Sequence, residues 1–217
     1  MAKKQPRNAG PRLGRRAGRG PNMPEHKHVL VVTEGTCTEP QYFENLGRVL
    51  NDKKIAIRCI PKGAKGNWNP DPLSVVEKAI EERDARDGEG RSKFVECFAI
   101  VDVDEWGDKL EKAMRLAQEE GITVIVSNPC FEVWLAMHSS KKCPSTKREI
   151  RELVEKEGLL MKEGKSLPPD FPKQDYEVAC ENAKTQCKTT AANKIGPVPS
   201  TAMPVFFDLV KRHFSED

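Results

Sequence analysis

The chain of 217 residues lacks a long apolar run and an apolar N-terminal segment. No stretch approaches the roughly 20 apolar residues that a helix needs to cross a bilayer. The N-terminus has no hydrophobic centre of the kind found in a signal peptide. We therefore expect no membrane association and a cytoplasmic location.

Paired cysteine motifs and a phosphate-binding loop are also missing. The seven cysteines are an odd set with no Cys-x-x-Cys pair, which argues against a disulfide framework and a structural zinc site. We expect most of them to be small buried hydrophobic residues. No Gly-x4-Gly-Lys-Ser/Thr segment occurs, so any nucleotide hydrolysis would have to come from another protein.

Positive charge is concentrated at the N-terminus. Residues 1–28 contain eight Lys or Arg and one acid, whereas residues 29–217 contain 28 basic and 32 acidic residues. Residues 1–27 are poor in apolar side chains and are predicted to be a disordered basic arm. Such an arm can bind nucleic-acid phosphates, and the alternative is a solubilising tail with no specific partner. The candidate contacts in the arm are Arg12, Arg15, Arg16 and Arg19.

Strand and helix patterns alternate through the first two thirds of the chain. Apolar runs predict strands at His28–Thr33, Ile55–Pro61, Val95–Val101 and Ile122–Ser127. Helical spacing predicts helices at Pro40–Leu50, Pro72–Arg86 and Trp106–Glu120. This order is typical of an α/β fold with a parallel sheet flanked by helices. We expect the catalytic core to span residues 28–138.

The pattern changes after Cys130. A short buried helix is predicted at Phe131–His138, with Phe131, Trp134 and Leu135 in the core. Further helices are predicted at Thr146–Glu157, Asp175–Thr190 and Met203–Phe214, with no further strand. Residues 139–217 are therefore expected to be a helical extension packed on the core.

Acidic residues follow three of the predicted strands. Glu34 follows the first, Asp102 and Asp104 follow the third, and Glu132 lies shortly after the fourth. Parallel strands would bring them to one sheet edge, where ligands bind in such folds, and carboxylate oxygens suit Mg²⁺ or Mn²⁺. We assign Asp102 and Asp104 as metal ligands and Glu34 as a ligand or general base. Glu132 either completes the site or is a favourable charge at a helix N-terminus.

Several further residues are candidates for contacts with nucleic acid. Trp68 lies in a polar loop near Lys65, where an exposed aromatic ring beside lysines would suit single-stranded nucleic acid. Asn128 could bind a phosphate or a loop backbone. A basic patch near the presumed active edge consists of Lys141, Lys142, Lys147 and Arg148. These residues are either phosphate contacts or part of a solvated helix start. Glu39 is expected either to join the acidic residues in one pocket or to cap the following helix.

The strand-Glu-Gly and strand-Asp-x-Asp motifs resemble those of the Toprim domain. This resemblance implies that Glu34 is a general acid/base or metal ligand and that Asp102 and Asp104 bind Mg²⁺. The stretches Thr33–Phe43 and Ser127–Leu135 resemble the signature segments of the RloB family. These are small Toprim-like proteins of prokaryotic defence loci, often encoded beside an ABC-type ATPase. The segment Gly196–Thr201 departs from the Asn-Pro-Ser-Thr sequence usual in that family.

The resemblance implies a Mg²⁺-dependent nuclease acting on DNA or on structured RNA such as tRNA. Its setting would be antiphage defence or abortive infection, with an ABC-type ATPase partner. Two alternatives remain. The chain is either a catalytically silent regulatory or nucleic-acid-binding subunit of such a complex, or a phosphotransferase acting on a small nucleotide.

Overall fold

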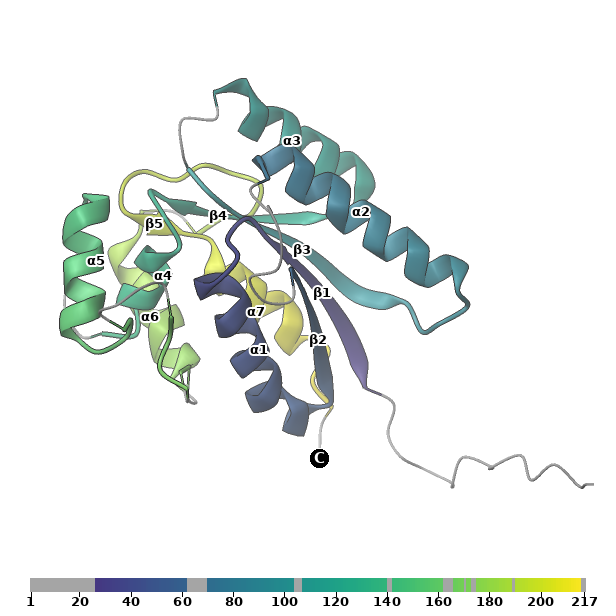
Figure 1. Cartoon of the computed structure of the whole chain (residues 1–217), viewed down its shortest axis with the longest axis horizontal. Coiled ribbons are helices and arrows are strands. Elements are labelled where there is room, and N and C mark those ends of the chain that lie inside the picture. Colours follow the sequence, from purple (N-terminus) through teal and green to yellow (C-terminus); the bar gives the residue numbers. More distant parts are fainter. Residues whose placement is uncertain are drawn as a thin grey trace, which may run out of the picture.

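The computed structural model describes residues 26–61, 70–103, 107–139, 142–161, 166–169, 171–172, 175–188 and 190–215. Nearly all of the expected basic arm, residues 1–25, lies outside these ranges. The described residues form helices packed on both faces of one sheet (Figure 1).

The sheet contains the four predicted strands and a fifth. The strands are β1 (Lys27–Thr33), β2 (Ile55–Ile60), β3 (Phe94–Asp102), β4 (Thr123–Asn128) and β5 (Ser200–Thr201), in the order β2-β1-β3-β4-β5. The first four are parallel, which confirms the predicted α/β class, and β5 runs antiparallel to β4. The expectation of no strand after residue 138 was therefore wrong. Two residues are too few to produce a periodic apolar signal.

Each central strand buries side chains on both faces of the sheet. Val29 and Val31 belong to the larger core, and Leu30 and Val32 belong to the smaller one. Burial on both faces explains the continuous apolar runs in the sequence. The helix α1 (Thr38–Leu50) covers the first face, while α2 (Pro72–Gly88) and α3 (Asp108–Glu120) cover the second.

The C-terminal helices complete the larger core. They are α4 (Glu132–Ala136), α5 (Lys147–Lys156), α6 (Tyr176–Gln186) and α7 (Met203–Lys211). Earlier in the chain, a short 3₁₀ helix, η1 (Asn51–Lys53), follows α1. In α7, Phe206 packs on Phe98 of β3 with ring centroids 4.6 Å apart. Trp134 of α4 is fully buried and contacts Phe207 at 5.6 Å. Phe131 and Leu135 are also buried, so the predicted core position of these three residues is confirmed.

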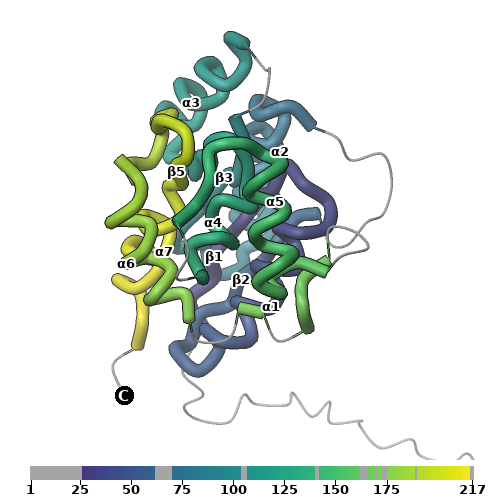
Figure 2. The backbone as a smooth tube through the Cα atoms, turned by 90° about the vertical axis from the view of Figure 1, so that its left-hand side faces the viewer, coloured from purple at the N-terminus to yellow at the C-terminus, as the bar shows by residue number. Residues whose placement is uncertain are grey.

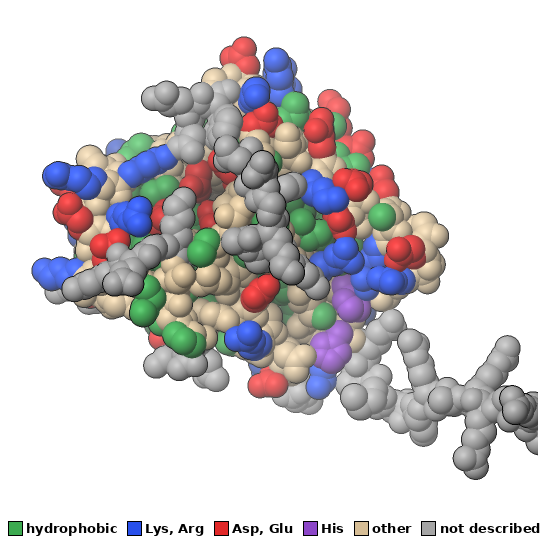
Figure 3. Space-filling model, viewed as in Figure 1, with side chains coloured by type: hydrophobic (Ala, Val, Ile, Leu, Met, Phe, Trp, Pro, Cys, Tyr) green, Lys and Arg blue, Asp and Glu red, His purple; other side chains and the backbone are tan. Residues whose placement is uncertain are grey.

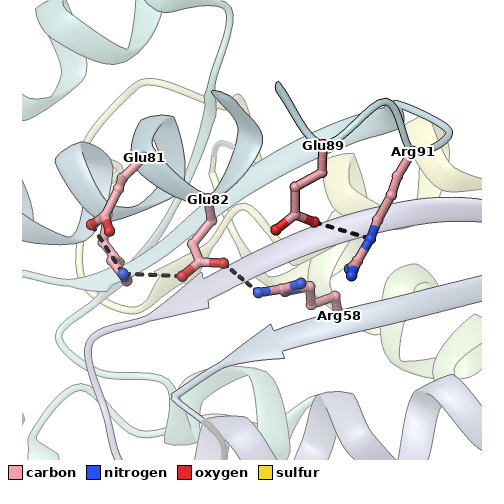
Figure 4. A network of polar contacts seen from close by, with 6 residues as sticks. Arg58, Glu81, Glu82, Glu89 and Arg91 are labelled. Atoms are coloured by element: carbon pink, nitrogen blue, oxygen red, sulfur yellow. Dashed lines mark hydrogen bonds and ion pairs between the residues drawn. The ribbon is translucent and has the colours of Figure 1, made fainter. Parts of the chain in front are cut away.

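A polar network attaches α2 to the exposed edge of the sheet (Figure 4). Arg58 of the edge strand β2 pairs with Glu82 of α2, and Lys78 bridges Glu82 at 3.0 Å and Glu81 at 2.9 Å. Partly exposed ion pairs of this kind contribute about 1 kcal/mol or less each. A charged side chain on an edge strand also disfavours pairing with a foreign strand.

The strand order creates a crevice between β1 and β3. From the carboxyl end of β1 the chain leaves through α1 on one face to β2, and from the carboxyl end of β3 it leaves through α3 on the other face to β4. Connections that leave to opposite sides separate at the carboxyl ends of the two strands, where ligands bind in open α/β sheets. Figure 2 views the molecule from this end, with α4 and α5 in front of the strands.

Candidate active site

Two of the acidic motifs meet at this crevice. Glu34 follows β1, and its backbone N–H donates to the carbonyl oxygen of Ile100 on β3 at 3.1 Å. The backbone N–H of Asp102, the last residue of β3, donates to Glu34 Oε2 at 3.3 Å. One hydrogen bond therefore places the Glu34 carboxylate against the end of the strand that carries Asp102.

A cavity of about 240 Å³ opens beside Asp102. Its wall includes the loop that joins β1 to α1, the residue pair Cys130 and Glu132 after β4, and two cations of α5. Among the lining side chains are three carboxylates and two cations: Glu39, Asp102, Glu132, Lys147 and Arg151. The structure thus brings Glu132 into the same cavity as Asp102, although the two are 30 positions apart in the sequence.

Glu39 folds back over Gly35. A Cβ atom added to Gly35 would lie only 2.0 Å from Glu39 Oε2, so the absence of a side chain at position 35 permits this close approach. The sequence offered two alternatives for Glu39, a helix cap or a member of the acidic pocket. The structure begins α1 at Thr38 with Cys37 at the N-cap and no side-chain cap hydrogen bond, so the capping expectation was wrong. Glu39 lies in the first turn of this helix and on the cavity wall, as the second alternative had it.

Opposite charges act on the Cys130 thiol inside the cavity. Burial raises the pKa of Cys130 most, and the neighbouring Glu132 and Asp102 carboxylates raise it further, while Lys147 lowers it. Glu132 also forms a hydrogen bond with this thiol. Cys130 is therefore a neutral thiol at physiological pH, and it lies within electrostatic range of both acids and one cation.

The described donors fit a magnesium ion held largely by water and substrate. Among the described residues, no three His, Cys, Asp or Glu side chains are grouped closely enough to hold a metal ion. Asp104, the second acid of the Asp-x-Asp motif, lies outside them. Of the three predicted ligands, the structure describes Glu34 and Asp102, which are joined by the hydrogen bond from the Asp102 backbone N–H to the Glu34 carboxylate. Mg²⁺ is commonly bound by one or two carboxylates, several waters and substrate phosphates.

The predicted nucleic-acid contacts are only partly described. Asn128 is buried, and its Nδ2 donates to the carbonyl oxygen of Gly196 at 2.7 Å. Asn128 was expected to bind either a phosphate or a loop backbone, and this bond is of the second kind. Lys142 is exposed and is not part of the cavity wall. The other candidates lie outside the described residues: Arg12, Arg15, Arg16, Arg19, Lys65, Trp68 and Lys141.

Sequence analysis missed Arg151, whereas it placed Lys147 in a basic patch near the expected active edge, and the structure puts both residues on the cavity wall. They are four residues apart on α5, whose apolar residues Ile150 and Val154 are fully buried. Thr146 caps this helix by accepting from the backbone N–H of Glu149 at 3.3 Å. The four-residue spacing was the available signal, because it places both cations on one side of the helix.

The fold and the site define an α/β protein with an acidic pair at the switch point of a mainly parallel sheet. The model of the RloB-like protein family matches residues 29–210, and the chain therefore belongs to the RloB-like family. No curated protein and no solved structure matches the chain. Family membership suggests a protein of a defence locus. Within the described residues, no helix has both the length and the apolar character needed to cross a membrane.

Proposed function

We propose that this protein is a Mg²⁺-dependent nuclease that hydrolyses phosphodiester bonds of DNA or of structured RNA such as tRNA. It would act in antiphage defence or abortive infection with an ABC-type ATPase partner. The observation that carries the proposal is the 3.3 Å contact between Glu34 Oε2 and the backbone N–H of Asp102 at the edge of an acidic cavity. Membership in the RloB-like family supports the defence setting.

Glu34 and Asp102, together with Asp104, would hold the metal ion. When bound, Mg²⁺ supplies Lewis-acid polarisation of a phosphate oxygen and lowers the pKa of a bound water. The Asp102 N–H fixes one oxygen of Glu34 at the strand end. This bond orients the Glu34 carboxylate before substrate binds, and pre-orientation of catalytic groups reduces the reorganisation needed during reaction.

The other two acids of the cavity are suited to proton transfer. Glu39 and Glu132 line the same space as Asp102, and a carboxylate within reach of an attacking water can accept its proton. Glu132 lies close enough to the Cys130 thiol for its charge to raise the pKa of that thiol. We assign Glu132 as the first candidate for general base, since it lines the cavity beside Asp102.

The test is cleavage by the purified protein with Mg²⁺, with Mn²⁺ or with EDTA. The substrates are plasmid DNA, single-stranded DNA and total tRNA. We expect metal-dependent cleavage that falls to background in the Asp102→Ala/Asp104→Ala variant. The matched control is Glu111→Ala/Glu119→Ala, which removes two exposed carboxylates of α3 outside the cavity and should retain full activity.

The same assay distinguishes an enzyme from a silent subunit. Each reaction is repeated with the ABC-type ATPase of the same locus and ATP. Cleavage that appears only in this mixture and is lost in the double aspartate variant supports the proposal. Nucleic-acid binding without cleavage in any mixture would instead identify a regulatory or binding subunit.

A further inference from the structure

The side of the cavity formed by α5 is positively charged. Lys147 and Arg151 line the same cavity as Asp102 and the other acids. Ile150 and Val154 anchor α5 in the core with no exposed surface. The backbone that carries the two cations is therefore fixed, while their charged ends reach the cavity. Figure 3 shows basic and acidic side chains close together at the end of the molecule where α5 lies.

Arg151 is held in place without losing its capacity to bind an anion. Its Nε donates to Glu155 Oε1 at 3.1 Å, and 46% of its side chain remains exposed. A guanidinium group has five N–H donors in a planar fork that matches the oxygens of a phosphate. The contact with Glu155 uses one of them and limits the orientations of the group.

Two other cations of the same helix lie outside the cavity wall. Arg148 is 84% exposed, pairs with Glu152 at 3.6 Å and does not line the cavity. Lys156, at the last position of α5, is also exposed and outside the cavity wall. Only two of these four α5 cations therefore face the acidic site.

We propose that Lys147 and Arg151 form the phosphate-binding side of the active cavity. They bind the phosphodiester backbone of the nucleic acid and offset the repulsion between that backbone and the carboxylates. This assignment rests on the proposed function for the identity of the ligand. A cavity of about 240 Å³ is smaller than the roughly 300–1,000 Å³ typical of small-molecule sites. It suits a phosphate group with its water better than a whole nucleotide.

The test measures binding separately from cleavage. Fluorescence anisotropy in EDTA follows labelled tRNA, single-stranded RNA and single-stranded DNA bound to the full chain. We expect Lys147→Ala/Arg151→Ala to weaken binding about tenfold or more and to lower the slope of log K against log salt by about 1–2, since two phosphate contacts are lost. The matched control is Arg148→Ala/Lys156→Ala, which removes the same charge from the same helix and should bind more tightly than the cavity variant.

Four outcomes bear on this inference. Equal losses for RNA and DNA support contacts with the backbone phosphates, whereas a loss confined to one of them would contradict it. Equal weakening in the cavity and control variants would overturn it, because net charge alone would then explain the effect. If the cavity variant alone binds weakly but the wild type never cleaves, the phosphate site stands and only the proposed nuclease function fails. Lys147→Arg/Arg151→Lys should recover part of the lost affinity and checks that folding is intact.

Discussion

At the scale of single residues, the site depends on a tightly packed turn at Thr33–Gly35. Thr33, the last residue of β1, donates from its hydroxyl to the carbonyl oxygen of Gly35 at 2.8 Å. Glu34 lies between them, and its carboxylate accepts from Asp102, 68 positions later. The turn therefore fixes the position of Glu34 at the end of the strand. The pairing of β1 with β3 brings the backbone N–H of Asp102 within hydrogen-bond distance of its carboxylate.

Replacing Gly35 with alanine should damage activity far more than stability. The added methyl group would lie 2.0 Å from Glu39 Oε2, and the Glu39 carboxylate can move away because it ends a flexible side chain. We expect a loss of cleavage of about tenfold or more, as displacements near 1 Å commonly cost more than that, with little change in Tm. The measurements are cleavage rate and thermal unfolding.

The control for this variant is Gly47→Ala. A Cβ at Gly47 would lie 3.6 Å from the Cβ of Ile57, an ordinary packing distance. Alanine inside a helix is favoured over glycine by about 0.5–1 kcal/mol, so this variant should be slightly more stable and fully active. Full activity in Gly35→Ala would show that the position of the Glu39 carboxylate does not matter for catalysis.

His138 should make the fold sensitive to acid. Its Nδ1 donates to the carbonyl oxygen of Trp134 at 3.1 Å, and Nε2 is buried with no hydrogen-bond partner among the described residues. Burial lowers the pKa of His138 from 6.5 to about 4. The unfolded chain therefore binds a proton between these values that the folded chain does not. As far as His138 is concerned, the free energy of unfolding is therefore highest above about pH 6.5, and it decreases as pH falls toward about 4.

The expected loss over this range is roughly 3 kcal/mol, from about 1.4 kcal/mol for each unit of pKa difference. Urea unfolding at a series of pH values measures it. In His138→Gln the side chain no longer titrates, so the part of the pH dependence that belongs to His138 should disappear. The same slope in wild type and variant would mean that other groups cause the acid sensitivity.

At the scale of elements, the last segment before α7 shows what local sequence could not reveal. Asn193, with a φ of 51°, donates its N–H to the carbonyl oxygen of Val124 at 2.9 Å and accepts from the N–H of Val124 through Oδ1 at 2.7 Å. Ala202 donates to Val126 at 3.0 Å. This segment therefore covers the edge of β4 through separate hydrogen bonds to Val124 and Val126 and not through a long paired strand. An asparagine tolerates this left-handed conformation, but nothing in the sequence indicated its partner.

Thr201 is expected to be the most sensitive residue of β5. Its hydroxyl pairs with Ser127 Oγ at 3.0 Å and accepts from the N–H of Met203 at 3.3 Å, and all three residues are buried. Thr201→Val keeps the shape and leaves both partners unsatisfied, which costs about 1–3 kcal/mol. Urea unfolding should show this loss. In Ser127→Ala/Thr201→Val the loss should be smaller than the sum of the single variants, and additive losses would mean that the hydroxyl pair is not formed.

At the scale of the whole molecule, the sequence predicted the layers but not how they assemble. Apolar runs and helical spacing were enough for the four parallel strands and the helices between them, because each depends on neighbours in the chain. The meeting of Glu34 and Asp102 followed from parallel strands alone. The approach of α5 to the cavity did not, since it depends on how α4 and α5 pack over the carboxyl end of the sheet (Figure 2). The four-residue spacing of Lys147 and Arg151 indicates that they share one side of α5, but only the structure shows that this side lines the cavity.

The division of charge between the two ends of the chain leads to the last prediction. Residues 1–24 contain seven Lys or Arg and no acid, whereas residues 29–217 have more acids than bases. If the arm binds phosphates, deleting residues 1–24 should weaken nucleic-acid binding and lower the salt slope by several units, since each phosphate contact contributes about 0.7–0.9. Cleavage at saturating substrate should change little, because Glu34, Asp102 and the cavity lie outside the arm. A full-length variant with these seven residues replaced by glutamine separates charge from length, and an unchanged salt slope in both would identify the arm as a solubilising tail.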